Sequence, residues 1–192
     1  MSTAHLNVEQ LIGALKEIRQ KEVVGAARSA IDQSMTEYVN RTRNDIILQL
    51  KAVQQPVPAR LLRARYRRTR TTMSRLSSRV DIGTMPFNPI RFPGIKDSGR
   101  YQRGRRGRVG QGVRARGGFR LHESFIAKAP NSGMDLVWTR DSTRGAYPIK
   151  VERIPIADEV TDAERRIKPE IETILLPQKF HEQLQQRLAK YR

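Results

Sequence analysis

Few side chains in this chain of 192 residues are able to perform covalent or metal chemistry, because it has three histidines and no cysteine. Without cysteine, the sequence excludes disulfides, zinc–thiolate sites and thiol nucleophiles. His5 and His181 have no second histidine or carboxylate at zinc-ligand spacing. His122-Glu123-Ser124 offers part of a triad, but the sequence identifies no converging partners, so a strand edge is the favoured interpretation. We therefore predict no catalytic residue, no cofactor site, no metal site and no enzymatic activity.

Arginine is the residue type whose distribution indicates a function. Residues 51–120 contain seventeen arginines and two lysines but only two acids, whereas residues 1–50 are neutral and residues 121–192 carry +1 of the total +18. Arginine suits bidentate contact with phosphate, and such binding weakens steeply with salt. Aromatic residues are scarce in this segment, which favours contact with a nucleic-acid backbone over base stacking. The distribution predicts a polyanionic partner, with nucleic acid favoured.

Two stretches hold most of these arginines. Pro58 suits the first turn of a helix predicted over 58–75, which has a small apolar face and is otherwise rich in arginine. A solvated basic face is the alternative, but no carboxylate lies between Asp45 and Asp81, and like charges at helical spacing oppose a helix that lacks an outside anion. Residues 99–118 hold seven arginines, seven glycines and no acid, which predicts a flexible loop or a hairpin arm that orders on a partner. The predicted contact residues are Arg60, Arg63, Arg65, Arg67, Arg68, Arg70, Arg100, Arg103, Arg105, Arg106, Arg108, Arg114 and Arg116.

Periodicity predicts the elements that position these arginines. Helical spacing indicates helices over 7–20, over 23–52 and from Thr161 to the C-terminus, where Thr161 and Glu164 form a capping box and Pro177 introduces a kink. Alternating apolar residues indicate strands at 79–82, 90–92, 119–127, 136–139 and 149–156, with turns at 131–133 and 140–145. The predicted fold class is α+β, with long N-terminal helices, a small antiparallel sheet carrying an extended basic loop, and a C-terminal helix. Its segments are 1–57 (helical), 58–120 (a basic insert of Arg helix, strand pair and Gly/Arg loop) and 121–192 (strands and C-terminal helix), within one domain.

The remaining features favour structural roles. Asp158, Glu159 and Asp162 are also candidate metal ligands, but acids near a helix start complement its dipole, and that interpretation is favoured. Trp138, the only tryptophan, is predicted to be a core or interface anchor. The sequence contains no run of about 18 apolar residues, so we predict no transmembrane helix. We also predict no signal peptide, because the N-terminal residues MSTAHLNVEQ lack its charged and then apolar layout.

The succession of segments resembles a known family. The chain reads GAARSAIDQSM, VPARLLRARYRRTR, SRVDIGTMPFNPIRFPG, a Gly/Arg loop, ESFIAKAPNSGMDLVWTR and YPIKVERIPI before a terminal helix. This order resembles the minor tail protein Z family of long-tailed phages, the tail completion proteins, across nearly the whole chain. The strongest matches are packing motifs at 125–126, 137–140, 147–149 and 154–156, whereas the N-terminal third matches in pattern only.

The resemblance implies a structural virion protein at the head-proximal end of the tail, assembled in the host cytoplasm. It implies a homo-oligomeric ring, sixfold-related, that contacts a tail terminator, tail tube or neck proteins, with DNA in or near the channel and no membrane. The basic segment then has two candidate partners, the end of the phage DNA or an acidic surface of an adjoining ring. The charge alone also permits a free nucleic-acid-binding protein of the ribosome- or nucleoid-associated type. The expected interface or core anchors are Trp138, Tyr147, Pro148 and Ile154.

Overall fold

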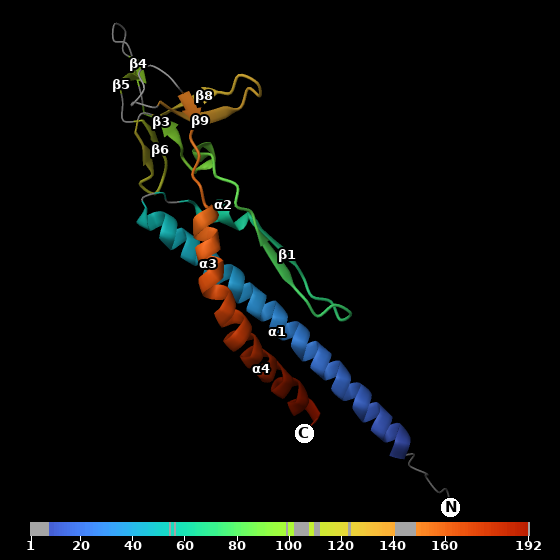
Figure 1. Cartoon of the computed structure of the whole chain (residues 1–192). Coiled ribbons are helices and arrows are strands. Elements are labelled where there is room, and N and C mark those ends of the chain that lie inside the picture. Colours follow the sequence, from blue (N-terminus) through green and yellow to red (C-terminus); the bar gives the residue numbers. More distant parts are fainter. Residues whose placement is uncertain are drawn as a thin grey trace, which may run out of the picture. The chain divides into compact units, whose positions relative to one another are not determined.

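The computed structural model describes residues 8–53, 55, 57–98, 100–101, 108–109, 112–122, 124–140 and 149–191 (Figure 1). The chain divides into two compact units. The first comprises Met1–Arg41, Arg67–Asp81 and Arg165–Arg192, and the second comprises Thr42–Tyr66 and Ile82–Glu164. No helix in the described part of the chain is long and apolar enough to cross a membrane.

A single helix, α1 (Val8–Ala52, 45 residues), replaces the two helices predicted over 7–20 and 23–52. The predicted break is wrong because no proline interrupts the segment, and one glycine inside a helix costs only about 1 kcal/mol relative to alanine. Of the two glycines in α1, Gly13 and Gly25, the one nearer the predicted break is Gly25, and it is buried. A Cβ at this position would stand 2.6 Å from Nη1 of Arg187, so the glycine makes room for a guanidinium group.

Two antiparallel helical segments form the body of the first unit. The C-terminal segment consists of the end of α3 (Ala157–Glu170), a π-helical turn (Ile171–Leu175), α4 (Leu176–Leu188) and a short 3-10 turn (Ala189–Tyr191). Figure 1 shows α4 running alongside the N-terminal half of α1. Ion pairs join the two segments at both ends, Glu22 to Arg187 at 3.3 Å and Arg41 to Glu170 at 2.6 Å.

The buried stripe of α1 in this unit is made largely of small side chains. Ala26, Ala30 and Ser34 are buried and follow one another at a spacing of four residues, so they lie on one face of the helix. Small residues allow helices to approach closely, but they bury little apolar area. The stability of this unit therefore depends on ion pairs and hydrogen bonds between the two helical segments as well as on its apolar core.

The C-terminal segment changes its helical geometry between two prolines. Pro169 lies inside α3 and Pro177 near the start of α4, and the π-helical turn falls between them. Proline has no N–H to donate to the carbonyl four residues earlier, and a π turn is a common way to absorb the lost hydrogen bond. The sequence located this irregularity near Pro177, but the π turn precedes that residue.

Small antiparallel sheets form the second unit and confirm the α+β class. The larger sheet has the order β10 (Ile149–Val151), β9 (Asp135–Arg140), β8 (Ser124–Lys128). Another has the order β3 (Lys96–Asp97), β6 (Val113–Arg114), β7 (Arg120–Leu121). A two-stranded ladder joins β4 (Arg100–Tyr101) to β5 (Arg108–Val109). The unit also contains Thr42–Ala52 of α1, the short helix α2 (Ala59–Arg63) and the first half of α3.

Aromatic and aliphatic side chains from these elements form the core of the second unit. Phe92 and Phe119 pack against each other with ring centroids 4.8 Å apart and ring planes tilted by 59°. Phe87 is buried and forms a bridge with Ile154, which is 2 % exposed. The other buried apolar residues described in this unit include Ile46, Leu50, Val57, Leu62, Pro89, Val113, Val137, Ile156, Val160 and Ala163.

Several predicted boundaries hold, and others do not. The strands at 79–82 and 136–139 correspond to β2 (Arg79–Ile82) and β9, and Gly133 has the positive φ (64°) of the turn predicted there. The strand predicted over 90–92 is wrong: Pro89–Arg91 forms a 3-10 turn, and Asn88 caps it by accepting from Ile90 N. The capping box at Thr161 is also wrong, because α3 already starts at Ala157. The turn predicted at 140–145 lies almost entirely outside the described residues.

Candidate nucleic-acid interface

The helix predicted over 58–75 is wrong beyond its first turn. Helix α2 ends at Arg63, and the chain then enters strand β1 (Tyr66–Thr69). With no acid nearby to compensate, a longer helix would hold arginines three and four residues apart, whereas a strand sends alternate side chains to opposite faces. Arg60 and Arg63 are exposed on α2.

In β1 the alternation separates arginines with different roles. Arg67 is exposed, whereas Arg68 is half-buried against α1. Nη2 of Arg68 lies 2.7 Å from Oδ1 of Asp32 and 3.0 Å from its carbonyl, and Nη1 donates to Thr36 Oγ1 at 2.9 Å. Charge-assisted hydrogen bonds of this kind are the strong ones. Arg68 therefore fastens the β1–β2 hairpin to α1 within the first unit.

Arg65 also makes a contact within the chain. Its guanidinium carbon lies 4.6 Å above the centroid of the Phe87 ring, a cation–π arrangement inside the second unit. Both Arg65 and Arg68 were predicted to contact an anionic partner, and the structure gives each an internal contact instead of leaving it wholly available.

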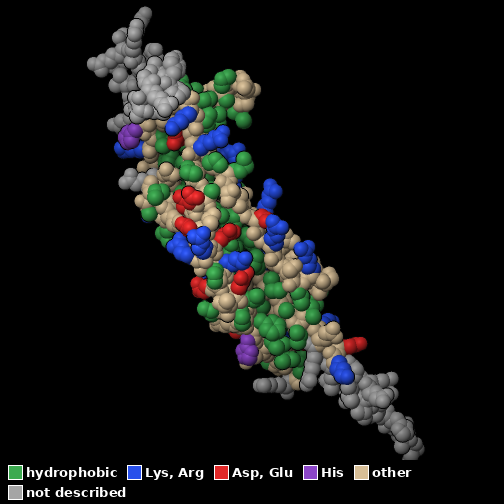
Figure 2. Space-filling model, viewed as in Figure 1, with side chains coloured by type: hydrophobic (Ala, Val, Ile, Leu, Met, Phe, Trp, Pro, Cys, Tyr) green, Lys and Arg blue, Asp and Glu red, His purple; other side chains and the backbone are tan. Residues whose placement is uncertain are grey.

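The hairpin keeps an exposed basic edge. Arg67, Arg70, Arg75 and Arg79 are exposed, and Figure 2 shows Lys and Arg side chains following this hairpin. Arg79 pairs with Asp81 at 2.7 Å, but both side chains are largely exposed, so the pair contributes little stability.

The sheet β3–β6–β7 gathers further cations, and these are closer together. Arg114 is the direct partner of Lys96 on one side and of Arg120 on the other. A cavity of about 530 Å³ beside this sheet is lined by Gly94, Lys96, Asp97, Ser98, Arg114, Ala115 and Arg116. Sequence reasoning selected Arg114 and Arg116 but not Lys96 or Arg120, because only the strand register places those two next to Arg114.

The other predicted contacts lie in the Gly/Arg stretch. Arg100 is in β4 and Arg108 in β5, where they pair with Val109 and Tyr101 respectively. Arg103, Arg105 and Arg106 lie outside the described residues. The pairing of β4 with β5 is antiparallel, and residues 102–107 between these strands lie outside the described residues.

The structure describes two of the four predicted interface or core anchors. Trp138 in β9 is half-buried, and its indole N–H donates to the carbonyl of Ala127 at 3.0 Å. Ile154 is in the core of the second unit. Tyr147 and Pro148 lie outside the described residues.

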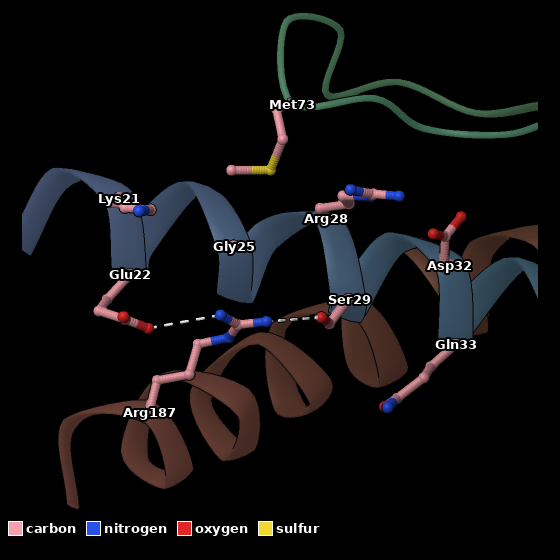
Figure 3. Close-up of a pocket in the computed structure, with 9 residues that line it drawn as sticks. All are labelled: Lys21, Glu22, Gly25, Arg28, Ser29, Asp32, Gln33, Met73 and Arg187. Carbon is pink, nitrogen blue, oxygen red and sulfur yellow. Dashed lines mark hydrogen bonds and ion pairs between the residues drawn. The ribbon is translucent and has the colours of Figure 1, made fainter. Parts of the chain in front are cut away.

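A second cavity, of about 460 Å³, lies in the first unit (Figure 3). In this view Arg187 reaches from α4 toward α1, where it pairs with Glu22 and donates to Ser29 Oγ at 3.1 Å. Met73 points from the hairpin tip toward α1. Both acidic and basic side chains line this cavity, and Arg187 is held there by Glu22 and Ser29, so its guanidinium group links α4 to α1 within the first unit.

Neither a metal site nor a triad around His122 and Ser124 is supported by the geometry of the described residues. They contain no group of three or more histidines, cysteines or acids able to hold a metal ion. Ser124, the candidate nucleophile of the partial triad, is buried and shares a hydrogen bond of 2.6 Å with Thr139 Oγ1. Its other recorded partner is the carbonyl of His122, at 3.3 Å, not the imidazole. The favoured interpretation as a strand edge agrees with this geometry.

The comparisons with known proteins give one match. No curated protein matches this chain, and no solved structure does. A family model described as "Prophage minor tail protein Z (GPZ)" matches residues 7–192, which is nearly the whole chain. The family agrees with the resemblance drawn from the packing motifs of the C-terminal half. This chain belongs to the prophage minor tail protein Z family, and is thus a phage minor tail protein, a component of the virion that interacts with other tail components.

Proposed function

We propose that this protein completes the head-proximal end of the phage tail as a closed, sixfold-related ring of identical subunits. Its neighbours in that position are a tail terminator, tail tube or neck proteins, and its role is structural, without catalysis. The basic segment meets the end of the packaged DNA in the channel. Membership of the family supports a location in the phage tail. The surface of the first unit supports assembly with further copies of the chain.

The observation that carries the assembly is the exposed apolar surface of the C-terminal helical segment. Ile174 is 62 % exposed, Tyr191 58 % and Leu188 40 %. Figure 2 shows hydrophobic side chains gathered over α4. Large exposed apolar patches on folded proteins mark surfaces that bind other proteins. We assign this surface to a contact with a second copy of the chain. A head-to-tail contact between identical subunits generates a closed ring when the rotation between neighbours closes on itself.

The test is the mass of the full-length chain in solution, by light scattering and sedimentation over a range of concentrations. We expect an oligomer of one defined size, and Ile174→Asp should shift the equilibrium toward the monomer. Thr173→Asp is the matched control, because Thr173 is the exposed neighbour in the same helical turn and lacks the apolar side chain. A chain that stays monomeric at every concentration contradicts the ring.

The alternative, a free basic nucleic-acid-binding protein, makes a different prediction in the same experiments. A monomer that binds RNA and DNA tightly, with no assembly on addition of tail or neck components, would favour it. For the ring, a phage deleted for this gene should yield filled heads and tails but no infectious particles. Supplying the protein should restore infectivity.

A further inference from the structure

Three cations form one row across the sheet β3–β6–β7 in the second unit. Arg114 of the central strand is the register partner of both Lys96 and Arg120. Directly opposed residues of antiparallel strands project to the same face, with Cβ atoms about 4.5–5.5 Å apart. The three positive side chains therefore share one face of the sheet within about 10 Å.

The opposite face of this sheet is turned to the rest of the unit. The next row consists of Asp97, Val113 and Leu121. Val113 is fully buried, and Oδ2 of Asp97 accepts a hydrogen bond from the backbone N–H of Ile126 in β8 at 3.1 Å. The carboxylate of Asp97 thus connects this sheet to β8, and the cationic row lies on the opposite face.

Such a row is unfavourable without an anion. Like charges directly opposite one another destabilise a sheet. Within the described part of the chain, no carboxylate is recorded at ion-pair distance from Lys96, Arg114 or Arg120. Nε of Arg114 is buried there without a hydrogen-bond partner. Lys96 and Arg120 are exposed, and so is Arg116 at the edge of the adjoining cavity.

We propose that this row, Lys96–Arg114–Arg120 together with Arg116, binds the phosphates of a nucleic-acid backbone. The inference deepens the proposed DNA contact and rests on it, because it assigns that contact to one face of one sheet. Guanidinium groups bind phosphate oxygens bidentately, and Arg116 in the wall of the cavity of about 530 Å³ adds a fourth cation beside the row. Its described lining contains no aromatic side chain, so the face contacts the backbone without stacking on bases and without reading sequence.

Nucleic acid suits the row better than an acidic protein surface does. Residues 82–120, which belong to the same unit as the row, carry nine arginines and one lysine against one acid, so their neutralisation needs an anion that extends beyond three charges. A phosphodiester chain supplies one negative charge at every nucleotide.

The experiment measures binding of a fluorescently labelled DNA duplex by the full-length chain at several salt concentrations. The test variant combines Lys96→Gln, Arg114→Gln and Arg120→Gln. The matched control, Lys128→Gln with Lys150→Gln and Arg153→Gln, removes the same charge from exposed positions of the same unit. Each lost phosphate contact lowers the slope of log K against log[salt] by about 0.9, so we expect a slope smaller by about 3 in the test variant and by less than about 1 in the control.

The variant also has a readout that does not depend on DNA. Because like charges oppose one another in the row, the test variant should unfold at the same temperature as the wild type or higher when no polyanion is present. Should the triple variant fail to fold, Arg120→Gln at its exposed position should still lower the slope by about 0.9.

Three results would overturn the proposal. The first is equal salt slopes in the wild type and the test variant, and the second is an equal loss in test and control variants. In the third, poly-glutamate displaces the duplex as readily as unlabelled duplex of equal charge, which assigns the face to an acidic protein surface. A wild-type chain that forms rings but binds no duplex at low salt refutes the phosphate-binding row and leaves the proposed ring intact. A chain that stays monomeric but binds duplex through the row refutes the proposed ring and leaves the phosphate-binding row intact.

Discussion

Replacing Gly112 with alanine should damage the sheet β3–β6–β7 far more than one methyl group suggests. Gly112 has a φ of 78°, and a Cβ there would stand 1.8 Å from the carbonyl oxygen of Leu121. Real Cβ atoms essentially never approach other atoms within 3.0 Å, so the backbone has to move. That movement pulls on the Val113–Leu121 pairing and on two hydrogen bonds that the Gly112 carbonyl accepts from Ser98, from its N–H at 3.0 Å and from its hydroxyl.

The magnitude follows from these contacts. An L-residue in the left-handed region costs about 1–2 kcal/mol, and alanine recovers about 0.4–1 kcal/mol by restricting the unfolded chain. Losing the two hydrogen bonds to the Gly112 carbonyl adds about 1 kcal/mol each. We therefore expect the free energy of unfolding to fall by about 3 kcal/mol. Gly118→Ala is the matched control, because Gly118 has a φ of 84° but nothing within 4 Å of a Cβ, and it should lose about 1 kcal/mol.

Urea unfolding followed by tryptophan fluorescence measures this difference. Trp138 is the only tryptophan and lies in β9, so the signal reports on the unit that contains Gly112. We expect Gly112→Ala to be less stable than Gly118→Ala by about 2 kcal/mol. Stabilities that agree within roughly 0.5 kcal/mol would refute the steric argument and leave only the backbone conformation as a cost.

Two further predictions concern polar contacts in the two units. Arg187→Ala leaves Glu22, whose side chain is 17 % exposed, without its cation. The substitution should lower the free energy of unfolding of the first unit by about 1–2 kcal/mol, measured by a circular-dichroism melt. A loss no larger than that of the exposed control Lys190→Ala would contradict a stabilising role for the Arg187–Glu22 ion pair. Burial raises the pKa of Tyr66 above its ordinary value, with the hydrogen bond to Thr42 acting in the opposite direction. Because the neutral phenol is favoured in the folded state, its contribution is complete below about pH 10 and disappears as pH rises through the raised pKa. The urea midpoint of the wild type should therefore fall more steeply in that range than that of Tyr66→Phe, and parallel curves would count against this assignment.

The fate of the arginines shows where prediction from sequence ends. Charge counting located the basic segment correctly, since charge depends only on composition. It did not distinguish Arg67, which is exposed, from Arg68, which is bound to Asp32. These two neighbours differ only in which face of β1 they occupy, and the sequence analysis expected a helix there. The error arose because local spacing favoured a helix, whereas the hairpin is stabilised by a contact with α1, 36 residues earlier.

The sequence by itself determined the α+β class, the family and the concentration of positive charge, because these follow from composition, periodicity and motif order. Only the tertiary structure decided which cations become neighbours. Lys96 and Arg120 lie 18 and 6 residues from Arg114 along the chain, yet strand register places both directly beside it. Register depends on turns such as the one at Gly112 and on the burial of Val113 against the rest of the unit. The cationic row is therefore a product of folding that no count of arginines contains.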